Sequence, residues 1–213
     1  MKRALLFLLL ISLPLLAQNK TGWRPLFDGH SLAGWQHVGP GQLVLEKDGL
    51  LKTEGGMGLL WYTPEKFGNC VIRVVYKTAK EDSNSGVFVR IGDKPEDEWW
   101  AVHHGYEVQI EDKEDPYHRT GATYSMGAAK AGASKGPGEW NTMEITLDGP
   151  VIIVTLNGTE ITHFDSNDPS IPPRQKSFEP ERGPRPDSGY IGLQNHGAND
   201  VVWFKEVSVR PLH

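Results

Sequence analysis

Short segments in which apolar and polar residues alternate run along most of the chain, and turn-forming residues separate them. Successive side chains of a strand lie on opposite faces of a sheet, so a period of two predicts strands with one buried face. The predicted strands are rich in β-branched residues and cover residues 42–46, 50–53, 70–78, 85–91, 106–111, 140–147, 151–156, 189–194 and 201–209. No segment after residue 17 shows a comparable helical period.

Two dipeptides that favour tight turns flank the segment 151–156. Asp148-Gly149 precedes it and Asn157-Gly158 follows it, which predicts hairpins on both sides. Many short strands at this spacing predict an all-β fold of the sandwich or jelly-roll type. Because neither an internal repeat nor a linker divides the chain, we predict one domain over residues 18–213.

The first residues have the pattern of a secretory signal peptide. Lys2 and Arg3 carry positive charge, residues 4–16 are almost purely apolar, and the small residue Ala17 ends the run. The apolar run is shorter than the roughly 20 residues that a membrane-spanning helix needs. We therefore predict a signal peptide over residues 1–17, export to the periplasm or the cell exterior, and no membrane span after cleavage. The alternative is a retained N-terminal anchor.

Composition narrows the function classes and the sources of stability. The net charge of −5 argues against a nucleic-acid surface, which is usually basic. Cys70 is the single cysteine and lies in an alternating apolar segment, so we predict a buried structural thiol without an intramolecular disulfide. Residues 165–187 hold many of the prolines and three arginines, which predicts a long surface loop, functional or merely solvated.

The alternation also assigns polar side chains to one face of three predicted strands. These residues are Phe88 and Arg90; Glu107, Gln109 and Glu111; and Gln194, with Asn195 and His196 just beyond the last strand. A curved sheet could bring them into one groove, where amides and carboxylates would bind sugar hydroxyls and aromatic rings would stack on sugar faces. Trp99 and Trp100 could add such a platform, or could anchor a loop in the core. The alternative for the whole set is an ordinary solvent-facing strand surface.

Several segments together resemble the 3-keto-disaccharide hydrolase domain family. They cover nearly the whole chain after residue 17, in the family's order, and are residues 26–35, 84–90, 106–110, 120–124, 138–141, 192–197 and 202–204. The resemblance implies a concanavalin A-like jelly-roll sandwich of two antiparallel sheets, with a curved sheet that faces a glycan. It therefore favours the groove over a plain solvated surface and adds Tyr124 to the expected substrate-binding residues Phe88, Trp99, Trp100, Gln194 and Asn195.

The implied chemistry is cleavage of 3-keto-glycosides. A ketone at C3 acidifies the hydrogen on C2, so that one base, one oxyanion stabiliser and one proton donor suffice for β-elimination, followed by addition of water. We expect Glu107 or His196 as the base, with Arg90 and Gln109 holding the oxyanion and hydroxyl groups. Classical retaining hydrolysis needs two carboxyl groups roughly 5 Å apart, whereas Glu107 and Glu111 are separated by about 13 Å of extended strand.

A divalent metal could instead polarise the ketone, although the candidate ligands His104 and Asp112 lack a tight metal-binding spacing. Two non-enzymatic alternatives share the predicted fold. One is a noncatalytic carbohydrate-binding module, and the other is a structural or interaction domain of the cell envelope.

Overall fold

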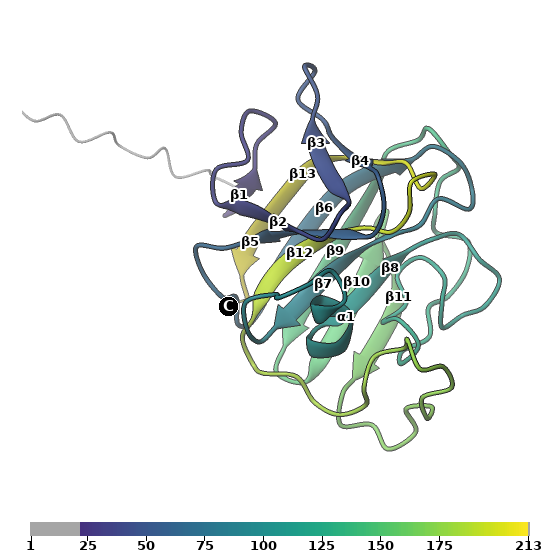
Figure 1. Ribbon diagram of the computed structural model, residues 1–213. Helices are drawn as coiled ribbons and strands as arrows, with labels where there is room; N and C mark the ends of the chain where they lie inside the picture. Colours follow the sequence, from purple (N-terminus) through teal and green to yellow (C-terminus); the bar gives the residue numbers. More distant parts are fainter. Residues whose placement is uncertain (1–21, 213) are drawn as a thin grey trace, which may run out of the picture.

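Antiparallel strands pair into two sheets in the computed structural model, which describes residues 22–212 (Figure 1). The predicted signal peptide lies outside the described residues. The elements are β1 Arg24–Phe27, β2 Trp35–Val38, β3 Gln42–Leu45, β4 Leu51–Glu54, β5 Gly58–Tyr62, β6 Cys70–Thr78, β7 Ser85–Ile91, α1 Trp100–His104, β8 Tyr106–Ile110, β9 Asn141–Asp148, β10 Val151–Leu156, β11 Thr159–Asp165, β12 Tyr190–Asn195 and β13 Val202–Pro211.

The larger sheet has eight strands in the order β11-β10-β9-β6-β13-β4-β3, with β1 paired to β13. The smaller sheet has five strands in the order β2-β5-β12-β7-β8. Strands from distant parts of the sequence are neighbours in both sheets, as expected for a jelly roll rather than a simple meander. The predicted all-β sandwich is therefore confirmed.

The alternating pattern located nine of the strands, and β6, β7 and β10 have the predicted bounds. The predicted hairpins are also present, because β10 pairs with β9 on one side and with β11 on the other. Asn157 and Gly158 connect β10 to β11 with φ angles of 51° and 85°, as a type I′ turn requires. The prediction missed β1, β2, β5, β11 and the one-turn helix α1, which are too short or too irregular in pattern to detect.

One hydrophobic core fills the space between the sheets. The smaller sheet contributes the inward side chains of β8 and β12, namely Tyr106, Val108, Ile110, Ile191 and Leu193. These are the residues that the alternation assigned to the buried face. Cys70 is buried in the same core, as predicted, and burial raises the pKa of its thiol to about 11, so the sulfur stays protonated and unreactive.

The outer face of the smaller sheet carries a second, smaller apolar cluster. It consists of Leu59, Trp61, Phe88 and Ile91 from the sheet, covered by Ala101 and Val102 of α1. Figure 1 shows α1 in front of this sheet. Because the helix is only one turn long, it covers part of the face and leaves the rest open for polar side chains. Among residues 22–212, no helix is long and apolar enough to span a membrane.

Candidate functional site

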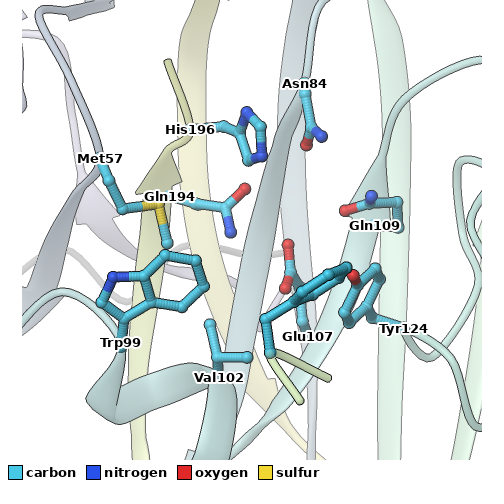
Figure 2. A pocket seen from close by; sticks show the side chains of 10 residues that line it. Met57, Asn84, Trp99, Val102, Glu107, Gln109, Tyr124, Gln194 and His196 are labelled. Atoms are coloured by element: carbon cyan, nitrogen blue, oxygen red, sulfur yellow. The ribbon is translucent and has the colours of Figure 1, made fainter. Parts of the chain in front are cut away.

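A cavity of about 240 Å³ lies on the outer face of the smaller sheet, beside α1 (Figure 2). Strands β8 and β12 contribute Glu107, Gln109 and Gln194 to its lining, and the other lining residues come from α1 and from the connections around the strands. These are Met57, Asn84, Trp99, Val102, Tyr124, Phe178 and His196. The structure thus brings together six predicted site residues: Glu107, Gln109, His196, Trp99, Tyr124 and Gln194.

Glu107 is the one carboxyl group that lines this cavity, and only 5% of the residue is exposed. Burial raises its pKa to about 8; a hydrogen bond from Gln194 opposes the rise, and the negative charge of Glu111 adds to it. No cation pairs with Glu107 among the described residues. At neutral pH the carboxyl group is therefore mostly protonated and can donate a proton.

The side-chain amide of Gln109 positions Glu107. With its nitrogen turned toward β7, the amide donates to Glu107 Oε1 at 3.0 Å and to the backbone oxygen of Ser85 at 3.1 Å. The opposite orientation would place the amide oxygen against these two acceptors. Gln109 thereby links the carboxyl group to the neighbouring strand and restricts its rotation.

His196 forms the second titratable part of the site. It follows β12 directly, and its Nδ1 lies 2.9 Å from Oδ2 of Asp200. A carboxylate beside Nδ1 accepts a hydrogen bond from the Nδ1–H group and so keeps that proton on Nδ1, which leaves the Nε2 lone pair free to accept a proton from another molecule. Asp200 was not predicted, although its position four residues after His196 on the same connection was a usable signal.

Two buried amide oxygens in the cavity lack a hydrogen-bond partner: Asn84 Oδ1 and Gln194 Oε1. A buried acceptor without a partner costs about 1–3 kcal/mol, so it calls for a ligand or an ordered water. Sugar hydroxyl groups are suitable donors for both. The sequence pattern did not identify Asn84 as a lining residue, because the predicted alternating strand 85–91 begins one residue after it.

Tyr124 adds a hydroxyl group to the same cavity, on the side away from Trp99 (Figure 2). Burial raises the pKa of its phenol to about 12, and the negative charge of Glu107 contributes to the rise. The hydroxyl group therefore stays protonated over the physiological range. The edge-on ring of His118, at a centroid distance of 5.1 Å, packs against Tyr124 and helps to fix it.

The predicted position of Arg90 in the groove is wrong. Ile91 pairs with Tyr190 and Phe88 with Gly192, so Val89 and Arg90 together oppose Ile191 in a β-bulge. Arg90 has a φ angle of 58° and is buried, and its Nη2 donates to Asn69 Oδ1 and to the Gly149 carbonyl oxygen. The bulge turns the guanidinium toward the end of the sandwich, away from the cavity, and moves Ile91 to the outer cluster.

Three further predicted substrate-binding residues pack elsewhere. Phe88 is fully buried beneath α1. Trp100 stacks on His104 at 4.1 Å and packs against the same apolar cluster, so only its neighbour Trp99 faces the cavity. Asn195 is on the opposite face of β12 from Gln194, and its amide donates to the backbone oxygens of Gln42 and Glu54. Its role is to join the two sheets.

The candidate metal ligands do not come together. His104 is exposed on α1, whereas Asp112 accepts hydrogen bonds from Thr120 and Ser134 beside a different cavity. Within residues 22–212 no three His, Cys, Asp or Glu side chains form a group that could hold a metal ion.

The proline-rich loop contributes to the site through Phe178, a residue that the sequence pattern did not single out. Arg182 holds this loop against the body of the protein. Its guanidinium donates to the backbone oxygens of Pro172 and Pro180, both at 2.8 Å, and to that of Ser125 at 3.1 Å. The loop is therefore fixed at the edge of the cavity.

Substitution of Gly86 by alanine is expected to impair the site without affecting the core. A Cβ atom at Gly86 would lie 2.4 Å from Glu107 Oε1 and 2.9 Å from its Cγ, so the carboxyl group must move. We expect any turnover to fall about tenfold or more with little change in melting temperature. Gly136→Ala, where a Cβ would meet no atom within 4 Å, is the matched control. Equal activities of the two variants would contradict this positioning.

A family model described as the 3-keto-alpha-glucoside-1,2-lyase-like domain matches residues 22–210. No curated protein sequence matches the chain significantly. Among solved structures, a "putative glycosyl hydrolase" from Parabacteroides distasonis is 30% identical, with a TM-score of 0.71 over 89% of this chain and 99% of that chain.

Two more distant structures share the fold alone. The carbohydrate-binding module CBM66 from Bacillus subtilis has a TM-score of 0.57 at 14% identity, over 83% of this chain and 95% of that chain. SCLam, a non-specific endo-β-1,3(4)-glucanase of family GH16, has a TM-score of 0.54 at 8% identity, over 89% and 91%. The same sandwich thus supports both a binding module and an enzyme, so the function must be argued from the site.

Proposed function

The chain belongs to the 3-keto-alpha-glucoside-1,2-lyase-like domain family, and we propose that it cleaves 3-keto-glycosides by β-elimination followed by addition of water. Family membership and the glycosyl hydrolase relative establish the coarser statement that the protein is carbohydrate-active. The observation that carries the finer proposal is the pairing, in one cavity, of a neutral buried carboxyl group with a histidine oriented by an aspartate.

The first step removes the proton from C2 of the sugar. We assign this step to Nε2 of His196, because Asp200 holds the proton on Nδ1 and leaves Nε2 as the acceptor. The electron pair of the C2–H bond moves into the C2–C3 bond, and the ketone oxygen becomes an oxyanion. The Tyr124 hydroxyl group, which stays protonated, is the donor we assign to this oxyanion.

The second step breaks the glycosidic bond. The C3 carbonyl reforms, a double bond forms between C1 and C2, and the C1–O bond breaks with its electron pair on the departing oxygen. Glu107 is the proton donor for this oxygen, because burial keeps its carboxyl group protonated at neutral pH. The resulting carboxylate then takes a proton from the water whose oxygen adds to C1, and the proton held on Nε2 of His196 returns to C2.

Substrate hydroxyl groups have partners in the two free amide oxygens, Asn84 Oδ1 and Gln194 Oε1. In contrast, ordinary glycosidases use two carboxyl groups. Glu111, which directly follows β8, forms an ion pair with Lys113 at 2.7 Å and does not line the cavity. A single carboxyl group favours the elimination, which needs only one carboxylic acid beside the base.

The rate of cleavage is expected to fall as the pH rises through about 8. Glu107 must hold its proton to serve as the donor, and its pKa of about 8 sets the upper limit of activity. Above this pH, kcat/KM should drop about tenfold per pH unit. If Glu107 were instead the base, the rate would rise up to pH 8, so a pH profile distinguishes the two roles.

The direct test compares a 3-keto-glucoside with its unoxidised parent, and follows release of the leaving group with and without chelator. We expect cleavage of the keto substrate only, without loss of activity in chelator. Cleavage of the parent would contradict the proposal and favour classical hydrolysis. Sugar binding without any cleavage would favour a carbohydrate-binding module such as the structural neighbour CBM66. Export remains a prediction, tested by locating the protein in cell fractions.

A further inference from the structure

The cavity has a polar part and an apolar part. Glu107, Gln109, Gln194, Asn84 and His196 carry the polar groups. Met57, Trp99, Val102 and Phe178 have no hydroxyl, amide or charged group. Figure 2 shows Met57, Trp99 and Val102 together on one side, with Asn84 and Gln109 on the other. We call Met57, Trp99, Val102 and Phe178 the apolar rim.

Trp99 and Phe178 are unusually exposed for their size. They are 43% and 51% exposed, and within residues 22–212 only Val44 joins them as a large hydrophobic residue with such exposure. Val44 lies on β3 and does not line the cavity, whereas both aromatic residues do. Large apolar side chains that remain exposed beside a cavity indicate a binding surface.

Both aromatic residues are attached to ordered segments. The backbone N–H of Trp99 donates to Asp97 Oδ1 at 2.9 Å, directly before α1. Phe178 is carried by the loop that Arg182 fixes, and Arg185 adds hydrogen bonds from its guanidinium to the backbone oxygens of Gly105 and Glu181 at 3.0 and 2.8 Å. Because these segments are already ordered, a ring that binds to the rim pays little additional ordering cost.

The rim suits a flat apolar group better than a second sugar. A second sugar could also stack on these rings, but all of its hydroxyl groups would lose water, and the rim offers them a single side-chain partner, the indole N–H of Trp99. An aryl ring would stack on Trp99 and Phe178 and contact the sulfur of Met57 without this loss. The cavity of about 240 Å³ is smaller than the roughly 300–1,000 Å³ of sites for drug-sized ligands, so a group beyond the first sugar must extend along the rim.

We propose that the apolar rim is a leaving-group subsite that selects glycosides with an aryl group over glycosides with a second sugar. This inference rests on the proposed function, because the sugar that is cleaved occupies the polar part. Phe178 and Trp99 are the specificity-determining residues.

The test compares benzyl 3-keto-glucoside with a 3-keto-disaccharide of the same anomeric configuration. We expect kcat/KM to favour the benzyl substrate by at least about tenfold. Phe178→Ala should lower kcat/KM for the benzyl substrate about tenfold and should change kcat/KM for the disaccharide less than about twofold. Phe178→Leu, which keeps an apolar but not an aromatic side chain, should give a kcat/KM for the benzyl substrate between those of Phe178→Ala and the unmodified protein. Val44→Ala is the matched control and should change neither value.

A binding measurement without turnover separates the two proposals. Calorimetric titration of unoxidised benzyl glucoside should show binding that weakens about tenfold in Phe178→Ala, with an unchanged melting temperature because the side chain is exposed. If no keto substrate is cleaved but this binding is observed, the proposed function fails and the apolar rim stands as an aryl-binding site only. Equal kcat/KM values for both substrates, or benzyl binding unaffected by Phe178→Ala, would overturn the subsite while the cleavage activity could still be present.

Discussion

Replacement of Glu107 by glutamine is expected to reduce kcat for a 3-keto-glucoside by about 10²–10⁴-fold, while binding of the sugar changes little. Glutamine has nearly the same shape and can still accept the hydrogen bond from Gln109, but it cannot transfer a proton to the departing oxygen. The measurement is kcat and KM for the two proteins, together with the dissociation constant of an unoxidised glucoside. The expected pattern is a large loss in kcat with a nearly constant dissociation constant.

Glu111→Gln is the matched control. Glu111 directly follows β8 and is as buried as Glu107, but it forms an ion pair with Lys113 and does not line the cavity. We expect this variant to keep most of its activity. If both glutamine variants lost activity equally, a specific role of Glu107 as proton donor would be wrong.

Glu107→Gln should also change how the stability of the protein depends on pH, and this effect can be measured without substrate. Burial raises the pKa of Glu107 from 4.5 to about 8, so between these values the folded protein keeps a proton that the unfolded chain has lost. The contribution of this group to the free energy of unfolding is thus complete below pH 4.5 and is lost as the pH rises to about 8. Glu107→Gln lacks this titration. The melting temperature of Glu107→Gln should therefore rise relative to that of the unmodified protein as the pH increases from 5 to 8. A difference between the two melting temperatures that stays constant over this range would contradict the raised pKa.

Replacement of His196 by asparagine is expected to reduce kcat by at least about 10²-fold, because it removes the group assigned to take up the C2 proton while Glu107 is mostly protonated at neutral pH. Asp200→Asn should have a smaller effect, since Asp200 acts only by holding the proton on Nδ1 of His196. Steady-state kinetics at pH 7 measure both effects, and a hydrogen–deuterium exchange assay at C2 of the substrate reports the proton removal directly.

His104→Asn serves as the control for this pair. His104 is exposed on α1, and its Nδ1 lies 3.0 Å from the backbone oxygen of Trp100. We expect its substitution to leave both kcat and C2 exchange unchanged. Retained C2 exchange in His196→Asn would show that another group is the base, and Glu107 would then be the first candidate.

The sequence determined the parts of this protein that depend on local pattern. Alternation places one set of side chains in the core and the next on the outer face, which was sufficient to place Glu107, Gln109 and Gln194 on the outward faces of their strands. The segments that resemble the family added Tyr124 and the jelly-roll fold. These inferences succeeded because strand periodicity depends only on the geometry of the extended backbone.

Only the tertiary structure decided which members of that face form the site. A single bulge removed Arg90 from the cavity, because one extra residue in a strand reverses every following side chain. The packing of α1 buried Phe88, and hydrogen bonds from Arg182 brought Phe178 of the proline-rich loop to the rim. Bulges, the seating of a one-turn helix and the path of a long loop all depend on contacts between distant segments, so no local pattern in the sequence specifies them.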